Sequence, residues 1–214
     1  FPYTTLFRSP SWESRPAWSP DGTKIAYVSS GEDTWIYYAP WSLAVIDVES
    51  GAVTRPAGVD AFHTRPQFTS DGSAVLTLAE GSRVTHVSRI DLATGAAQWT
   101  RELAPEYPWL GSLAAVTVAD GAAIANYARQ DGMTSWSAAT GARQWELRSA
   151  RTVAINATPI AHDGELYVAN SAGVVTALDL ATSSQRWSTT LTPDASDWSY
   201  AITATPALAD GRLF

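Results

Sequence analysis

A spaced repeat constrains the fold of this 214-residue chain more than any other feature. The dipeptide Asp-Gly recurs at 21–22, 71–72, 120–121, 163–164 and 210–211, in steps of 50, 49, 43 and 47 residues. A second marker, acid-x-x-Thr/Ser-Gly, lies at 47–51, 91–95, 137–141 and 179–183, with Ser137 in place of the acid and Ser183 in place of the glycine. A two-marker repeat of this length indicates an array of similar structural units.

Each repeat contains four short runs of alternating or β-branched residues, bounded by turn residues. The second repeat has them at 63–69, 74–80, 85–92 and 96–103, and the fourth at 155–161, 165–170, 174–180 and 185–191. Asp-Gly and Thr-Gly between such runs predict tight hairpins. Four strands in about 45 residues are typical of a β-propeller blade. We therefore expect an all-β fold, an incomplete ring with four four-stranded antiparallel blades (12–57, 63–103, 113–148 and 155–191) and the start of a fifth from Ala201.

Neither end of the chain coincides with the boundary of a repeat. Residues 1–9 read Phe-Pro-Tyr-Thr-Thr-Leu-Phe-Arg-Ser, which resembles the translation of a sequencing adapter, and we expect them not to be native. The last residues, 211–214, fall in the middle of a repeat. We therefore expect a fragment that is truncated at its C-terminus and in which a signal peptide is not observable.

Composition excludes several classes of protein. The net charge is −7, and the basic residues form no run that could follow a phosphate backbone, so nucleic acid and anionic membranes are poor partners. The absence of cysteine excludes a disulfide scaffold, a thiol nucleophile and thiolate metal sites. No apolar stretch approaches the length of a transmembrane segment.

The first two repeats share one motif. Residues 15–22 read Arg-Pro-Ala-Trp-Ser-Pro-Asp-Gly, and residues 65–72 read Arg-Pro-Gln-Phe-Thr-Ser-Asp-Gly. This motif resembles the TolB-type propeller repeat, which also occurs in the propellers of prolyl-oligopeptidase-like peptidases. The resemblance covers residues 12–95, and the second copy departs from it at Phe68 and Ser70.

The later repeats have a different motif. Residues 157–164 read Ala-Thr-Pro-Ile-Ala-His-Asp-Gly, residues 204–211 open another copy, and residues 177–187 read Ala-Leu-Asp-Leu-Ala-Thr-Ser-Ser-Gln-Arg-Trp. Residues 95–214 thus resemble the pyrroloquinoline-quinone-like (PQQ-like) repeat of the quinoprotein alcohol dehydrogenase-like superfamily. We divide the chain into TolB-like blades at 12–103 and PQQ-like blades at 113–214, in one continuous propeller.

The PQQ-like resemblance assigns a role to three tryptophans, Trp99, Trp145 and Trp187, each four residues past the Gly or Ser of its turn. In that family such side chains pack between neighbouring blades, so we expect all three to be largely buried and structural. The first blade departs from the pattern, with Arg55 at the corresponding place.

Aromatic residues gather in the long connecting segments 31–42, 104–112 and 192–199, which alternation of chain direction places on the face opposite the tight turns. The candidate ligand face consists of Trp35, Tyr37, Tyr38, Trp41, Tyr107, Trp109 and Trp198. Aromatic and acidic residues on loops of a rigid scaffold suit protein, glycan or cationic ligands. The alternative is that these rings pack beneath their own loops.

No catalytic constellation is present in the sequence. It has no Gly-x-Ser-x-Gly, phosphate-binding loop, Gly-x-Gly-x-x-Gly or His-Glu-x-x-His. His63 and His86 lie in the second repeat and His162 lies in the fourth, and we interpret them as surface or turn residues. We therefore predict no catalytic and no metal-binding residue.

Two function classes remain open. The first is a non-catalytic binding or assembly scaffold of bacterial origin, extracytoplasmic by resemblance, since fold relatives scaffold envelope complexes or accompany exported hydrolases. The second is the propeller portion of an enzyme, either a PQQ-dependent quinoprotein dehydrogenase or an accessory propeller of an exported peptidase or metallophosphoesterase. Only the quinoprotein alternative implies a cofactor, PQQ. Because such folds support many functions, the choice rests on the resemblance.

Overall fold

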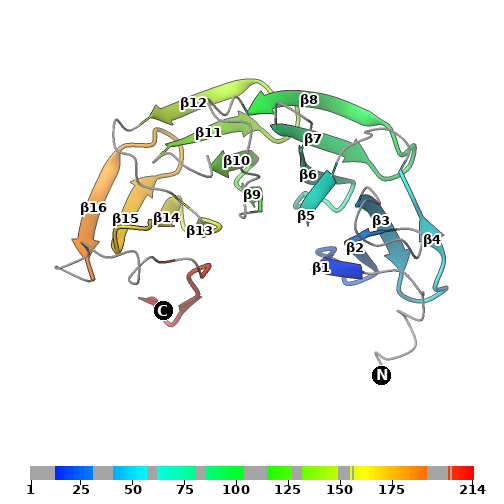
Figure 1. The fold of residues 1–214 in the computed structure, drawn as a ribbon, viewed down its shortest axis with the longest axis horizontal. Coiled ribbons are helices and arrows are strands. Elements are labelled where there is room, and N and C mark those ends of the chain that lie inside the picture. The colour runs from blue at the N-terminus through cyan, green and yellow to red at the C-terminus, as the bar shows by residue number, and fades with distance from the viewer. Residues whose placement is uncertain are drawn as a thin grey trace. The chain divides into compact units, whose positions relative to one another are not determined.

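The structure is a computed structural model of residues 1–214, shown in Figure 1. It describes residues 13–30, 41–56, 62–80, 85–103, 115–126, 132–148, 155, 157–191, 202 and 204–214. The chain divides into two compact units, Phe1–Ala104 and Pro105–Phe214. Residues 1–9, which we interpret as adapter-derived, lie outside the described residues.

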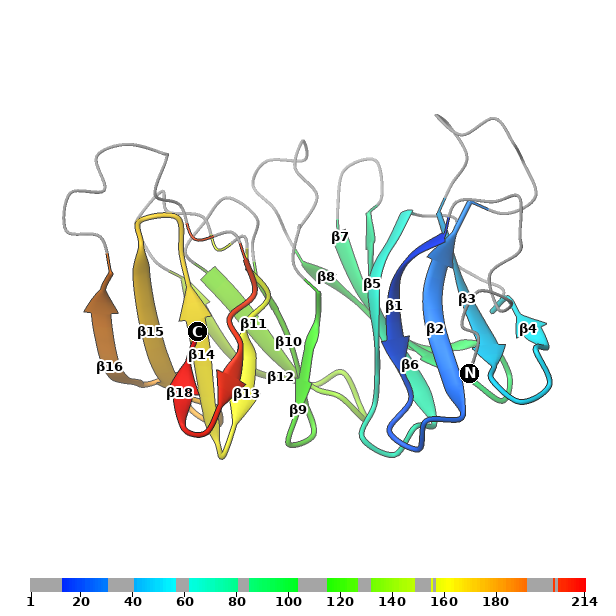
Figure 2. The same ribbon diagram turned by 90° about the horizontal axis from the view of Figure 1, so that it is seen from below.

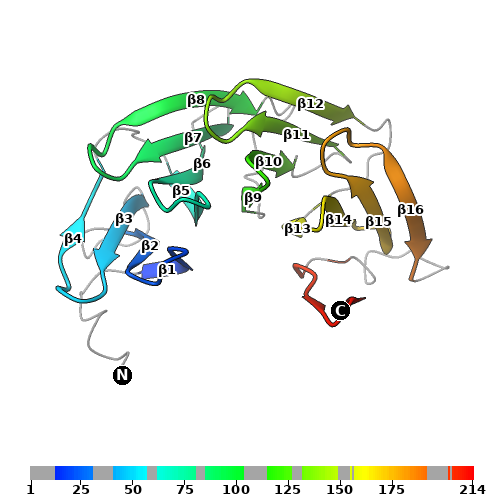
Figure 3. The ribbon, with the colours of Figure 1, turned by 180° about the vertical axis from the view of Figure 1, so that it is seen from behind.

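The first unit holds two four-stranded antiparallel sheets, each with its strands in chain order. The strands are β1 (Glu13–Trp18), β2 (Lys24–Ser29), β3 (Ser42–Asp47), β4 (Val53–Thr54), β5 (Phe62–Phe68), β6 (Ala74–Glu80), β7 (Thr85–Asp91) and β8 (Ala97–Leu103). In Figures 1 and 3 the first strands of the two sheets, β1 and β5, lie side by side, and these strands are in contact.

The second unit repeats this arrangement and adds a hairpin. Its strands are β9 (Thr117–Ala119), β10 (Ala122–Asn126), β11 (Gly132–Ser137), β12 (Arg143–Arg148), β13 (Ile160–His162), β14 (Glu165–Ala169), β15 (Val174–Asp179), β16 (Gln185–Thr190), β17 (Leu208–Ala209) and β18 (Arg212–Leu213). The described residues contain strands and turns and no helix. The predicted fold is therefore confirmed: four four-stranded antiparallel blades and the opening hairpin of a fifth, a partial β-propeller.

The Asp-Gly turns differ in type between the units. In the second unit both residues of the turn have positive φ, for example 49° at Asp163 and 71° at Gly164, which is the two-residue type I′ hairpin. In the first unit only the glycine does, with φ of 71° at Gly22 and 68° at Gly72, within a longer loop. The two sequence motifs thus form two different hairpins.

The cores lie between successive sheets of a unit. In the first unit Ala26, Leu43 and Val45 of one sheet pack with Phe68, Val75 and Ile90 of the next. In the second unit Ile124 and Met133 pack with Leu166, Val168 and Leu178. Burial of such aliphatic side chains against the next blade is the main stabilising term in a repeat fold.

Some strands differ from the sequence-based boundaries by several residues. The run from Ile155 predicted a strand up to Ala161, but β13 begins at Ile160. Pro159 precedes it and has no backbone N–H for the ladder. The first blade was predicted to run to residue 57, and its last strand, β4, ends at Thr54, two residues before Pro56.

The part of the chain that the structure describes has no helix long and apolar enough to cross a membrane.

Candidate functional site

Each sheet has a turn end and a long-segment end. In the first sheet Lys24 pairs with Asp47 beside the Asp-Gly turn, and Ser29 pairs with Ser42 at the other end. Trp41 directly precedes Ser42 and is partly buried. Figure 2 shows the tight turns of β1–β2 and β5–β6 at the same, lower edge of their sheets. The position of Trp41 is thus the one that the alternation of chain direction predicts.

The other aromatic residues of the candidate ligand face lie outside the described residues. These are Trp35, Tyr37, Tyr38, Tyr107, Trp109 and Trp198. The ligand face therefore stays a prediction, with Trp41 as its one described member.

The aspartates of the first-unit Asp-Gly turns bind their own loops. The Asp71 carboxylate accepts hydrogen bonds from the Thr69 hydroxyl at 2.6 Å, the Ser73 hydroxyl at 2.9 Å and the Ser73 backbone N–H at 3.0 Å. Asp21 accepts the equivalent three bonds from Ser19 and Thr23. These donors, the threonine or serine hydroxyl first, lower the pKa of each carboxyl to about 2.

The second marker, acid-x-x-Thr/Ser-Gly, also forms a closed turn. Asp91 accepts hydrogen bonds from the Thr94 N–H and hydroxyl, both at 2.8 Å, and Asp47 does the same with Ser50. In the third blade Ser137 replaces the acid, and its hydroxyl accepts from the Thr140 N–H at 3.3 Å. The acid of the motif is thus a turn-stabilising acceptor.

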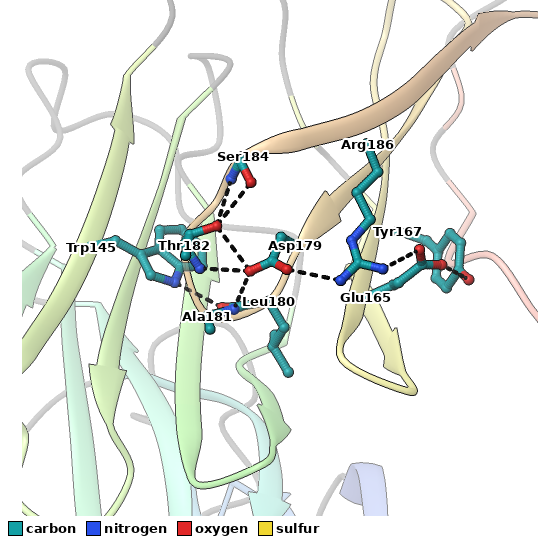
Figure 4. Close-up of polar contacts among 9 residues, drawn as sticks. All are labelled: Trp145, Glu165, Tyr167, Asp179, Leu180, Ala181, Thr182, Ser184 and Arg186. Carbon is teal, nitrogen blue, oxygen red and sulfur yellow. Dashed lines mark hydrogen bonds and ion pairs between the residues drawn. The ribbon is translucent and has the colours of Figure 1, made fainter.

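The fourth blade extends this turn into a polar cluster, shown in Figure 4. Arg186 donates to Asp179 at 2.8 Å and to Glu165 at 3.0 Å, and the Tyr167 hydroxyl donates to Glu165 at 2.5 Å. The Arg186 guanidinium, followed by the donors of Thr182, lowers the pKa of Asp179 to about 2. The Tyr167 ring lies against Trp187, with 6.1 Å between ring centroids.

Polar contacts join the third and fourth blades. The Trp145 indole N–H donates to the Leu180 carbonyl at 2.9 Å, the Thr117 hydroxyl donates to the Pro159 carbonyl at 2.6 Å, and the Ala115 N–H donates to the Thr158 hydroxyl at 2.8 Å. The fully buried Asn126 side chain donates to the Ile155 carbonyl. We call these four bonds the inter-blade seam.

Sequence reasoning missed most of this seam. It assigned Trp145 to blade packing but gave no role to Thr117, Asn126 or Thr158. One signal was available, because Ala-Thr-Pro occurs at 157–159 and again at 204–206, each time before an Asp-Gly hairpin. The donors opposite these residues follow no motif in the sequence.

The three repeat tryptophans have different environments. Trp99 is buried, with 7% of its surface exposed, and Trp145 is partly buried in the seam. The expectation of burial is wrong for Trp187, which is 41% exposed. Trp145 packs beside a complete next sheet, whereas the described residues after Trp187 form only the hairpin β17–β18. Leu180, the acceptor for Trp145, directly follows the third strand of its sheet, and the described residues after Trp187 include no third strand.

The three histidines lie in two different sheets. His63 lies in β5 and His86 in β7, whereas His162 lies in the second unit, where its Nε2 is 3.3 Å from the carboxylate of Asp163. Among the described residues no group of three histidine, aspartate or glutamate side chains could hold a metal ion.

The described carboxylates with shifted pKa values all shift downward. They are Asp21, Asp47, Asp71, Asp91, Glu165 and Asp179. A general acid or base works best with a pKa near the operating pH, so a lowered pKa suits a fixed acceptor rather than a proton-transfer group. The chemistry of these sites is that of structural anions.

A comparison with protein-family models identifies the family of this chain. Residues 21–214 match the family model described as outer membrane protein assembly factor BamB, a PQQ-like repeat family. The chain belongs to this BamB-like family. The resemblance of residues 95–214 to PQQ-like repeats is therefore confirmed, and the match also includes most of the first two blades.

Solved structures agree with the BamB-like fold. The crystal structure of BamB from Moraxella catarrhalis is similar with a TM-score of 0.63 and 18% sequence identity, over 91% of this chain and 52% of that one. A chain in the crystal structure of the mitotic checkpoint complex is similar with a TM-score of 0.65 and 14% identity, over 92% of this chain and 53% of that one. The BamB-like chain thus spans about half the length of both. No curated protein matches it.

Proposed function

We propose that this BamB-like chain is part of a non-catalytic propeller scaffold that binds a protein or glycan partner outside the cytoplasm. The family description, an outer membrane protein assembly factor, supports both the assembly role and the location. The observation that carries the proposal is the use of the carboxylates. In the described residues, those with shifted pKa values serve as ionised acceptors of turns and ion pairs.

The partner would bind at the long-segment end of the sheets. At the turn end, the Asp-Gly turns of the first unit and the acid-x-x-Thr/Ser turns are closed by hydrogen bonds to their own aspartates. The opposite end carries Trp41 and, in sequence, the remaining aromatic residues of the candidate ligand face. Rigid aromatic side chains supply contact area at low cost in conformational entropy.

Intrinsic tryptophan fluorescence tests this proposal. The chain would be titrated with soluble cell-wall glycan fragments and, separately, with a lysine-rich peptide. We expect the double variant Trp109→Ala, Trp198→Ala to weaken the response by about tenfold, the effect of losing contact-forming aromatic residues at the centre of an interface. The matched control Trp187→Phe changes an exposed tryptophan that lies outside the long segments.

Two results would contradict the proposal. One is an affinity that is equal in the double variant and in the control. The other is oxidation of an alcohol when PQQ and Ca²⁺ are added to the chain, measured by the reduction of a dye. This result would favour the quinoprotein alternative.

A further inference from the structure

Two arginines occupy a backbone conformation that side-chain-bearing residues rarely adopt. Arg15 in β1 has a φ of 59° and Arg65 in β5 has a φ of 39°. Each precedes a proline, and proline disfavours helical backbone conformations in the residue before it. In the described tight turns of the first unit the left-handed positions belong to glycines, such as Gly22 and Gly72. Both strained arginines therefore stand where glycine or asparagine would be easier to accommodate.

The strain comes from the same local structure in both blades. The pairing of β1 with β2 shifts register between Ser14 and Ala17, and the pairing of β5 with β6 shifts between Thr64 and Gln67. One extra residue therefore stands in each strand, a β-bulge that contains the arginine and its proline. Bulges of this kind re-aim a side chain and occur beside functional sites.

The two strands that carry the bulges are neighbours. β1 and β5 contact one another, and each is the terminal strand of its own sheet, joined by hydrogen bonds only to the second strand. In a propeller such first strands line the central channel. The charge of Arg15 acts on Arg65, where it adds to the effect of burial in lowering the pKa of the Arg65 guanidinium. Two like charges on adjacent strands repel each other unless an anion lies between them.

Arg65 also has an unused donor. It is half-buried, and its Nε atom is buried with no hydrogen-bond partner among the residues that the structure describes. A buried donor of a charged group costs stability when it stays unpaired. Arg186 in the second unit shows the contrast, since its guanidinium is satisfied by two carboxylates. A structural arginine would be expected to have such partners.

We propose that Arg15 and Arg65 form an oxyanion-binding site on the first strands of neighbouring blades, which takes a carboxylate or phosphate group of a ligand. The planar guanidinium presents a fork of donors that matches both groups in bidentate fashion. The backbone strain, the buried donor and the proximity of two positive charges then share one explanation. The site is independent of the aromatic loops and of the scaffold role.

Isothermal titration calorimetry at low ionic strength tests the site, with citrate as the carboxylate probe and inorganic phosphate as the second. Arg15→Asn and Arg65→Asn each remove the guanidinium and leave a residue that tolerates the left-handed conformation. We expect each substitution to weaken binding of the preferred probe by about tenfold or more, as for the loss of a charge-assisted bidentate pair. The probe that binds more tightly identifies the oxyanion.

The control is Arg55→Gln, which removes the same charge from an exposed position in the same unit and should leave the affinity within about twofold. Arg65→Lys keeps the charge and loses the fork, so it should bind more weakly than the unmodified chain. Melting temperatures of the asparagine variants should equal or exceed that of the unmodified chain, since the strain is relieved. Absence of binding for both probes, or an equal loss in Arg55→Gln, would overturn the proposal.

Discussion

The indole N–H of Trp145, in the last strand of the third blade, donates a 2.9 Å hydrogen bond to the carbonyl of Leu180, which follows the third strand of the fourth blade. This bond links the tryptophan of one repeat to the acid-x-x-Thr/Ser turn of the next (Figure 4). It explains how a residue that recurs in the sequence can hold successive blades together. The docking role of the other repeat tryptophans stays a prediction.

Replacing Trp145 by phenylalanine should destabilise the second unit. An aromatic ring remains at this position, but the Leu180 carbonyl loses its donor, and a lost hydrogen bond of this kind costs about 1 kcal/mol. Urea unfolding followed by circular dichroism measures the change. Trp187→Phe is the matched control, and because Trp187 is 41% exposed, its effect should stay below about 0.5 kcal/mol. Equal effects of the two substitutions would contradict the docking role.

The turn aspartates should make stability depend on pH. Folding lowers the pKa of Asp71 to about 2, through the Thr69 hydroxyl and the Ser73 donors. The folded state therefore binds this proton less readily than the unfolded chain. The stabilisation is present above the unfolded pKa, about pH 4, and is lost as the pH falls through about 2.

Melting temperatures measured between about pH 5 and pH 2 test this linkage. Asp71→Asn should melt lower than the unmodified chain near neutral pH and lose less stability on acidification. Asp120→Asn is a suitable control, since the structure shows no hydrogen bond to the Asp120 side chain among the described residues and asparagine accepts its φ of 46°. The same pH profile for the unmodified chain and Asp71→Asn would show that the turn bonds do not stabilise the ionised form.

Ser183→Gly should stabilise the fourth blade. Ser183 has a φ of 59° at the position where Gly51, Gly95 and Gly141 stand in the other blades. Relief of left-handed strain should outweigh the added freedom of the unfolded chain by about 0.5–1 kcal/mol. The reciprocal change Gly95→Ser should destabilise by a similar amount. If the denaturant midpoints of both variants shifted in the same direction, this interpretation would be wrong.

Sequence patterns predicted the parts of the fold that depend on local chemistry. The Asp-Gly and acid-x-x-Thr/Ser motifs placed the hairpins because these turns close through their own side chains, as at Asp71 and Asp91. Strands β6 and β7 lie within one residue of their predicted limits. Trp99 is buried as its repeat position implied.

Features that depend on neighbouring chain segments could not be predicted. Burial of Trp187 depends on a following sheet, of which the described residues form only the hairpin β17–β18. The seam bond between Thr117 and Pro159 joins residues that are 42 positions apart and follow no shared motif. The strain at Arg15 and Arg65 appears only once φ is known, since Arg-Pro is an ordinary dipeptide in sequence.

Site-specific photo-crosslinking tests whether the scaffold binds its partner at the long-segment end of its sheets. The crosslinking amino acid would replace Trp41 at that end or Thr94 at the turn end, and the chain would be mixed with detergent-extracted outer membranes of a Gram-negative bacterium. We expect a discrete protein or glycan adduct from position 41, which excess unlabelled chain abolishes. We expect no adduct from position 94. Equal adducts from both positions, or a discrete adduct from position 94 alone, would contradict this expectation.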